Sequence, residues 1–341
     1  MPTSITPILK EISKKSNVPL STLRRNAKIL KDINLITYGD ASNFQGVELT
    51  ELGWFISRLM VSKELPLVNL VKTSSGLRPL GSVIRDMRKT VLRMVAEAGS
   101  GHLGASLSAI EVLAVLYFLK MRHDPKNPAW AERDRFILSK GHAAPALYAV
   151  LAEAGYFPRG ELFTLRKLGS RLQGHPDTRT PGVDAMTGSL GQGLSMAVGM
   201  ALAAKMDGAE YGVYALLGDG ELDEGQIWEA AMTAAHYGLD NLIAIVDRNQ
   251  YQLSGRTENV KSLEPLNEKW SSLGWEVLEA DGHDPEIILD ALDKCSLVSG
   301  RPSVIIAKTT KGKGVSFMEG NIFSKRAPNF KELEKALAEL S

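Results

Sequence analysis

The stretch that decides the fold is GDGELDEGQIWEAAMTAAHYGLDNLIAIVDRNQ, residues 218–250. It begins where the apolar segment YGVYALL (211–217) ends in an aspartate between two glycines. A helical pattern follows over 223–238, and a second apolar segment, 241–246, ends just before Asp-Arg-Asn. Short apolar strands separated by a helix are typical of a parallel sheet covered on both faces. The stretch therefore predicts a β-α-β unit.

Polar residues stand at the carboxyl ends of both predicted strands, namely Asp219 and Asn249. Ligands of open parallel sheets bind beyond these ends, and successive strands are usually neighbours, so we expect the two side chains to converge. Both offer hard oxygen ligands, which suit Mg²⁺ or Ca²⁺. Gly218 and Gly220 allow the backbone to approach a bulky anion, which the N-terminus of helix 223–238 also favours. A tight turn with a cap uses the same residues, but the 30-residue spacing favours a metal and phosphate site.

The same alternation of helices and strands runs from about residue 80 to the end of the chain. It predicts an α/β fold with a doubly wound, mostly parallel sheet, preceded by a small winged helix-turn-helix-like domain. The expected organisation is a winged-helix-like domain over 1–72, an α/β domain over 73–320, and a C-terminal tail with a short solvated helix over 321–341.

Composition places the chain among ordinary globular proteins. It has 341 residues, a net charge of +1, and one cysteine, Cys295, which cannot form an internal disulfide. A single cysteine indicates a reducing compartment and excludes cysteine-rich zinc sites. No apolar block resembles a secretory signal or reaches the length of a membrane-spanning helix. We expect a soluble cytoplasmic protein that does not bind membranes.

The first 72 residues contain ten Lys/Arg against six Asp/Glu. STLRRNAKILK (21–31) reads as a recognition helix, with Arg24, Arg25, Lys28 and Lys31 available to DNA. An interaction or packing domain uses the same fold, and a fold does not fix a function. Both readings stay open.

Beyond GDG and Asn249, four further stretches occur in an order and spacing that resemble the N-terminal half of a transketolase. The GDG-to-Asn spacing is similar to the thiamine diphosphate motif of that family, so the expected α/β domain is of the thiamine-diphosphate-binding type. The resemblance covers about residues 80–320. The four stretches are GSGHLGASLSAIEVLAVLY (99–117), DRFILSKGHAAPALYAVLAEAGYF (134–157), QGHPD (173–177) with TGSLGQGLSMAVGMALAAK (187–205), and AKTTKGKGVSFME (307–319).

The resemblance implies thiamine diphosphate and a divalent metal, Mg²⁺ or else Ca²⁺ or Mn²⁺, as cofactors. It implies that Asp219, Asn249 and the carbonyl of Tyr251 bind the metal. The metal would bridge the diphosphate, whose charges are costly to bury alone. The positions that match cofactor contacts of the family are His142, Gly188, Ser189, Leu190, Gly220 and Asn249.

The implied reaction transfers a two-carbon ketol unit from a ketose phosphate to an aldose phosphate, as in the pentose phosphate pathway. His102 and His175 match histidines of the substrate channel that bind hydroxyls and help to move protons. Glu224 and Glu229 match acidic residues that couple the two sites near the subunit interface. His123 and His236 are interpreted as structural. His283 is intermediate, and it stands where the family has a similar turn, mostly near the surface.

Two departures from the family pattern stand out. Relatives have a histidine that touches the diphosphate, and the matching position in the run SKRAPN (324–329) is Ser324. Lys325 or Arg326 could supply the positive charge in place of that histidine. The chain also ends where a full-length transketolase would begin its pyrimidine-binding domain. The resemblance thus implies a split enzyme. Its expected partner is a separate chain, the C-terminal transketolase subunit, and its expected assembly is a heterotetramer.

Two alternatives remain beside a split transketolase. One is another thiamine diphosphate enzyme, such as a 2-oxoacid dehydrogenase component or a deoxyxylulose-phosphate-type synthase. The other is a DNA-binding regulator that senses thiamine diphosphate without catalysis. The sugar pair is not determined by the sequence.

Overall fold

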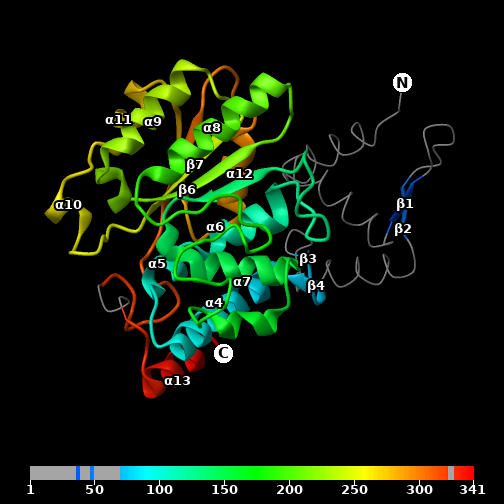
Figure 1. The fold of residues 1–341 in the computed structure, drawn as a ribbon, viewed down its shortest axis with the longest axis vertical. Coiled ribbons are helices and arrows are strands. Elements are labelled where there is room, and N and C mark those ends of the chain that lie inside the picture. Colours follow the sequence, from blue (N-terminus) through cyan, green and yellow to red (C-terminus); the bar gives the residue numbers. More distant parts are fainter. Residues whose placement is uncertain (1–35, 39–46, 50–69, 322–325) are drawn as a thin grey trace. The chain divides into compact units, whose positions relative to one another are not determined.

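The computed structural model describes residues 36–38, 47–49, 70–321 and 326–341 (Figure 1). The chain divides into two compact units, Met1–Leu70 and Val71–Ser341. In the first unit the described strands β1 (Ile36–Tyr38) and β2 (Val47–Leu49) pair in antiparallel fashion. The predicted helices of the winged-helix-like domain, with Arg24, Arg25, Lys28 and Lys31, lie outside the described residues, so that domain stays a prediction.

The second unit is built on a parallel sheet whose strand order is β5-β6-β7-β9-β8. The central strands are buried along almost their whole length, because helices cover both faces and leave no face for polar residues. The predicted α/β fold with a mostly parallel sheet is confirmed. The five strands are β5 (Arg135–Leu138), β6 (Val213–Gly218), β7 (Leu242–Arg248), β8 (Glu276–Asp281) and β9 (Ser303–Lys308).

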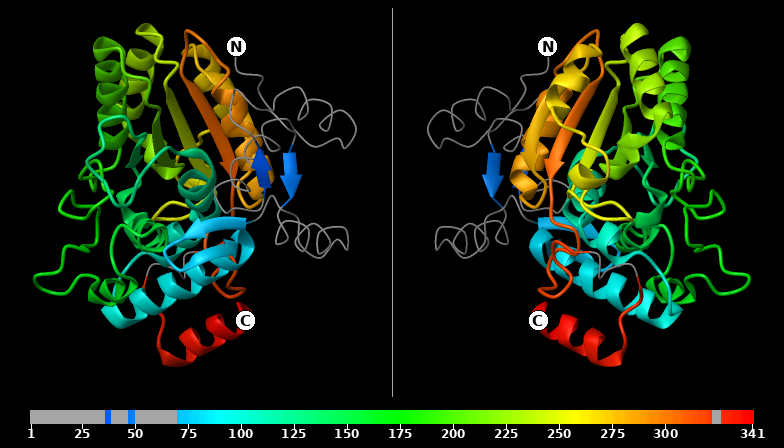
Figure 2. Two further views of the ribbon diagram at one scale, coloured as in Figure 1. Left: turned by 90° about the vertical axis from the view of Figure 1, so that its right-hand side faces the viewer. Right: turned by 90° about the vertical axis from the view of Figure 1, so that its left-hand side faces the viewer.

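Helices form the two layers around this sheet (Figure 2). One apolar core lies against α8, α9 and α11, and the other lies against α4, α6, α7 and α12. Neighbouring residues of one strand, such as Leu216 and Leu217, belong to opposite cores because side chains alternate across a strand. The helices and helical turns are α4 (Leu80–Ala98), α5 (Leu103–Leu107), α6 (Ile110–Val115), η2 (Leu116–Lys120), η3 (Gly141–Ala143), α7 (Ala144–Ala154), η4 (Arg159–Thr164), α8 (Gln192–Asp207), η5 (Gly220–Asp223), α9 (Gly225–His236), α10 (Thr257–Val260), α11 (Leu266–Ser272), α12 (Pro285–Cys295) and α13 (Phe330–Glu339).

The β6–α9–β7 unit is the predicted β-α-β unit. β6 and β7 are direct neighbours in parallel register, with Gly218 opposite Asp247. The loops that follow the two strands therefore leave the same edge of the sheet side by side.

Three tryptophans lie together under this unit, between α9, α11 and the start of β8. The rings of Trp228 and Trp270 have centroids 5.4 Å apart, and those of Trp270 and Trp275 are 4.9 Å apart. The indole nitrogen of Trp228 donates to the carbonyl of Leu222 at 2.9 Å. The cluster thus joins the outer helix layer to the loop that follows β6.

Two segments are more ordered than the sequence suggested. Around the expected boundary at residues 72–73, β3 (Leu70–Thr73) and β4 (Gly76–Pro79) pair as a hairpin, and the N–H of Ser74 donates to the carbonyl of Glu153 at 2.7 Å. The C-terminal helix α13 is not solvated all round, since Ala336 is buried and Ser316 binds Glu339. Among the described residues, no helix combines the length and apolarity needed to cross a membrane.

The thiol of Cys295, at the end of α12, should not react with thiol reagents in the folded chain. The residue is fully buried, and burial raises the pKa of its thiol to about 11. Because the thiolate is the reactive form, a chromogenic disulfide reagent at pH 8 should label no described thiol before unfolding and one after it. Rapid labelling of the folded chain, followed by absorbance, would contradict this burial.

Candidate active site

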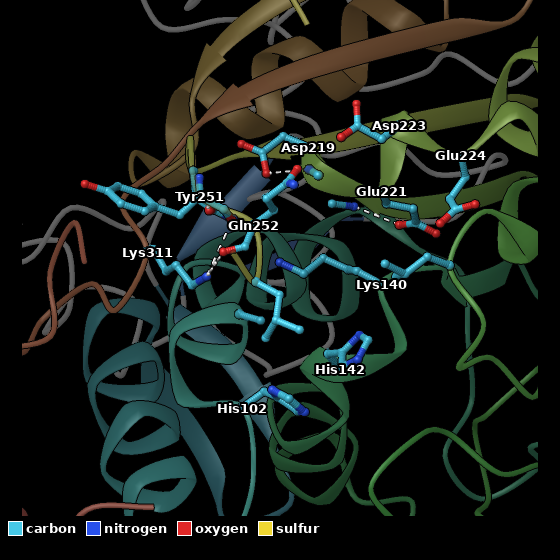
Figure 3. Close-up of a pocket in the computed structure, with 16 residues that line it drawn as sticks. His102, Lys140, His142, Asp219, Glu221, Asp223, Glu224, Tyr251, Gln252 and Lys311 are labelled. Carbon is cyan, nitrogen blue, oxygen red and sulfur yellow. Dashed lines mark hydrogen bonds between the residues drawn. The ribbon is translucent and has the colours of Figure 1, made fainter. Parts of the chain in front are cut away.

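A cavity of about 360 Å³ opens at the carboxyl ends of β5, β6, β7 and β9 (Figure 3). Histidines line one side of it, and the residues that follow β6 and β7 line the other. The ammonium ends of Lys140 and Lys311 point toward one another across the space between them. The lining residues are His102, Ala105, Lys140, His142, Leu190, Gly218, Asp219, Gly220, Glu221, Asp223, Glu224, Asn249, Tyr251, Gln252, Leu253 and Lys311.

Asp219 and Asn249 converge at this edge, as predicted. Asp219 is 1% exposed, and its carboxylate accepts from the N–H of Gly220 at 2.8 Å and from the N–H of Gln250 at 2.5 Å. Asn249 is 7% exposed, and its side-chain oxygen accepts from the N–H of Tyr251 at 3.1 Å. The backbone thus fixes both side chains at the edge of the cavity.

Gly220 is required by the closeness of two loops. A Cβ at this position would lie 2.5 Å from the Cβ of Gln252, nearer than carbon atoms can approach. The glycine after Asp219 therefore lets the loop after β6 pack against the loop after β7. This close packing brings Asp219 and the Tyr251 carbonyl to one side of the cavity.

The electrostatics of Asp219 favour a cation. Burial and then the charge of Asp247 raise the pKa of its carboxyl to about 6, against the opposing effects of Arg248 and the two backbone N–H groups. Gln252 Oε1, next to Gly220, is buried without a hydrogen-bond partner. A carboxylate, a carboxamide and a carbonyl are the oxygen donors that a divalent metal prefers, so these residues fit a metal that carries an anionic group.

A buried ion pair supports the floor of the cavity. The Lys140 ammonium donates to Asp247, which also accepts from Ser108 at 2.6 Å and from Thr309. Burial would raise the pKa of Asp247, but Lys140, Ser108 and Thr309 outweigh it and lower the pKa. The network joins the ends of β5, β7 and β9 to the segment before α6.

The three predicted functional histidines form one row. The rings of His102 and His142 have centroids 4.6 Å apart, and those of His142 and His175 are 5.1 Å apart. Burial, together with repulsion from the neighbouring histidines and lysines, lowers the pKa of His142 to about 4. Burial also lowers the pKa values of His102 and His175, with Arg166 adding to both shifts. All three rings are therefore neutral near pH 7.

The loop TGSL continues into a second, open hollow of about 660 Å³. His175 lies in its wall, and the buried Nε2 of this histidine has no hydrogen-bond partner. Gly188 and Ser189 line this hollow, whereas Leu190 lines the first cavity. The hollow is lined by Arg166, Gln173, Gly174, His175, Pro176, Asp177, Met186, Thr187, Gly188, Ser189, Gln192 and Met196.

The two predicted acidic residues differ in position. Glu224 lines the cavity, but Glu229 is exposed on α9 and lines neither cavity. His283 lies in a turn, is half-buried and is bonded through Nδ1 to Glu111 at 3.3 Å. Ser324 lies outside the described residues, and its role stays a prediction.

Sequence reasoning missed several residues of the site. Glu221 is buried and accepts from Ser139, from the N–H of Gly218 at 2.9 Å and from the N–H of Gly191 at 3.0 Å, which ties three loops together. Lys140 and Lys311 reach the cavity directly. All three stand inside motifs that were already recognisable, SKGH, GDGEL and TKGKG, so their motif membership was the available signal.

The fold and the cavity define a thiamine diphosphate-binding domain. Residues 81–336 match the family model described as "Transketolase, thiamine diphosphate binding domain". This chain belongs to the transketolase family. The predicted cofactor class and transketolase assignment are thereby confirmed.

The chain is similar to short relatives that are named as transketolase subunits and to longer transketolases. The "6-deoxy-6-sulfo-D-fructose transketolase subunit SqwG" of Clostridium sp. (strain MSTE9) is 51% identical over 74% of this chain and 93% of the relative. One of the subunits of the apulose-4-phosphate transketolase of Phocaeicola vulgatus is 47% identical over 74% of this chain and 91% of the relative. The solved transketolase of Campylobacter jejuni is 38% identical, with a TM-score of 0.72 over 76% of this chain and 42% of that chain.

The substitution Asp219→Asn separates function from stability. We expect at least a tenfold loss of Mg²⁺-dependent thiamine diphosphate binding, because the amide cannot supply the negative ligand charge. The cofactor-free chain should unfold at the same or a higher temperature above pH 6, since a raised pKa means that folding disfavours the ionised carboxyl there. Calorimetric titration and thermal unfolding check this, with the exposed Asp207→Asn as control. Unchanged cofactor binding would refute the metal assignment.

The neutral His142 should make the chain acid-sensitive. Below pH 6.5 the unfolded histidine binds a proton, whereas folded His142 stays neutral down to about pH 4. The free energy of unfolding should therefore fall as pH decreases through this window, by up to about 1.4 kcal/mol per pH unit for one histidine. Urea unfolding between pH 7 and 5 should show a shallower pH slope for His142→Gln. Equal slopes for the two proteins would contradict a depressed pKa.

Proposed function

We propose that this chain is the thiamine diphosphate-binding subunit of a two-chain transketolase. In this function a two-carbon ketol unit passes from a ketose with an anionic end group to an aldose phosphate. The observation that carries the proposal is the placement of Asp219 and Asn249 opposite the neutral His102 and His142 across one cavity, with His175 packed against His142 in the adjoining hollow. Thiamine diphosphate supplies the carbon nucleophile and the electron sink for the cleavage of the C–C bond.

The cofactor's charged end fits the side of the cavity formed by the loops after β6 and β7. Asp219, Asn249 and the carbonyl of Tyr251 would hold the divalent metal, with Mg²⁺ as the first choice and Ca²⁺ or Mn²⁺ as substitutes. Lys140 and Lys311 would add positive charge near the diphosphate. A buried dianion needs such compensation, since an unpaired buried charge is very costly.

The histidines would handle the sugar. His102 and His175 stay neutral near pH 7, so each has one nitrogen that donates and one that accepts a hydrogen bond. Nε2 of His175 has no hydrogen-bond partner in the chain, and a sugar hydroxyl would satisfy it. A neutral imidazole can take a proton from a hydroxyl and return it to another oxygen, which ketol transfer requires.

A second chain would complete the site. This chain matches 93% and 91% of the length of the two relatives named as subunits. It matches only 42% of the length of the solved transketolase. The open hollow beside α8 and the exposed position of Glu229 suit a surface that a partner chain covers. We infer a heterotetramer that contains a separate pyrimidine-binding chain.

The relatives suggest the substrate class. Their names specify apulose 4-phosphate in one case and 6-deoxy-6-sulfo-D-fructose in the other, which are ketoses that end in a phosphate or a sulfonate. We propose a donor of the same chemical class for this chain. Neutral ketoses should be poor donors by comparison.

The test is an assay of this chain with and without its partner subunit. Phosphorylated ketoses, 6-deoxy-6-sulfo-D-fructose and pyruvate are offered in turn as donors with an aldose phosphate as acceptor. We expect ketose-dependent transfer only when both chains are present, at least a hundredfold above this chain alone. Full activity of the single chain would refute the split enzyme, and turnover of pyruvate alone would favour another thiamine diphosphate enzyme.

A further inference from the structure

The loop after β9, residues 310–314, brings Lys311 to the cavity and has unusual support. The Lys311 ammonium donates to the carbonyls of Tyr251 and Gln252 at 3.4 and 3.3 Å. Two glycines in the loop have positive φ, Gly312 at 78° and Gly314 at 92°. The loop is thus a tightly turned segment, with a bond from the N–H of Lys313 to the carbonyl of Thr310 at 3.2 Å and one from the N–H of Gly312 to the carbonyl of Gly104 at 3.3 Å.

One end of the loop is held by His283. The N–H of Thr310 donates to His283 Nε2 at 2.8 Å. Since Nε2 accepts a hydrogen bond, Nδ1 bears the ring hydrogen in the neutral tautomer and donates to Glu111 at 3.3 Å. His283 follows β8 and Glu111 lies on α6, so neither belongs to the cavity lining.

The other end of the loop is held by Arg88 of α4. Arg88 Nε donates to the carbonyl of Lys313 at 3.2 Å, and its terminal nitrogen pairs with Glu111. Gly314 lies against the same side chain, where an added Cβ would be 2.9 Å from Arg88 Cδ. Both ends of the segment Thr310–Lys313 are therefore tied, through two different partners, to one carboxylate.

That carboxylate is ionised. Burial would raise the pKa of Glu111, but the hydrogen bond from His283 and the charge of Arg88 lower it. Glu111 is 5% exposed and Arg88 is 7% exposed, so the pair is protected from solvent. An ionised carboxylate that accepts hydrogen bonds from two side chains fixes the orientations of both partners at once.

We propose that Glu111 is a positioning residue for cofactor binding, which holds Lys311 at the cavity by anchoring the loop through His283 and Arg88. The inference rests on the proposed thiamine diphosphate function. The position of Lys311 matters because its ammonium contacts the Tyr251 carbonyl, the same oxygen that would bind the metal. A shift of the loop would move this positive charge relative to the oxygen that would bind the metal and to the diphosphate that the metal would carry.

The test measures the dissociation constant of thiamine diphosphate, with Mg²⁺, by calorimetric titration of the assembled two-chain enzyme. The variants are Glu111→Gln, His283→Phe, Lys311→Met and the two double variants that include Lys311→Met. We expect each positioning variant to weaken binding about tenfold, in the range typical for residues that orient ligands indirectly. Glu334→Gln, on the exposed face of α13, is the matched control and should bind as the parent does.

The double variants give the decisive result. If Glu111 and His283 act through Lys311, neither double variant should bind more weakly than Lys311→Met alone. The proposal would be overturned if the losses of affinity of the single variants multiply in a double variant. It would also be overturned if either His283→Phe or Lys311→Met binds the cofactor as the parent does. Because Glu111→Gln removes the buried counter-ion of Arg88 and lowers stability, His283→Phe at a half-buried loop position provides the independent test. Failure of the parent enzyme to bind the cofactor would instead refute the proposed function.

Discussion

The burial of the Asp219 carboxylate at the end of an apolar strand is the constraint on which the site depends. The sheet is apolar on both faces because helices cover it, so polar groups gather where the strands end. Asp219 and Asp247 are both buried at this edge, and their charges disfavour each other. Lys140 compensates Asp247, while Arg248 only partly compensates Asp219. The remaining deficit of positive charge is what suits this edge to a divalent cation.

Much of the fold and the centre of the site follow from local sequence. The apolar run 213–217 and the segment 242–246 are buried strands, and a helix of ordinary length joins them, so their adjacency is predictable. The convergence of Asp219 and Asn249 follows from that adjacency alone. The order of the last strands does not, because β9 inserts between β7 and β8 for reasons of packing that no local pattern records.

The supporting contacts were less predictable because they join distant parts of the chain. Lys140 and Asp247 are 107 positions apart, and Glu111 and His283 are 172 apart. A lone glutamate in an apolar helix, such as Glu111, offers no periodic signal for its partners. The position of Glu229 shows the converse limit, since a residue that matches a family motif can still face away from the cavity of its own chain.

The tryptophan cluster beneath the β6–α9–β7 unit gives this chain a built-in optical probe. Trp228 is bonded to the carbonyl of Leu222, next to Glu221 in the loop that follows Asp219, and its ring adjoins Trp270. Indole emission depends on local polarity and on neighbouring rings that exchange excitation. Rearrangement of this loop around a bound anion would thus alter the intrinsic fluorescence without any attached label.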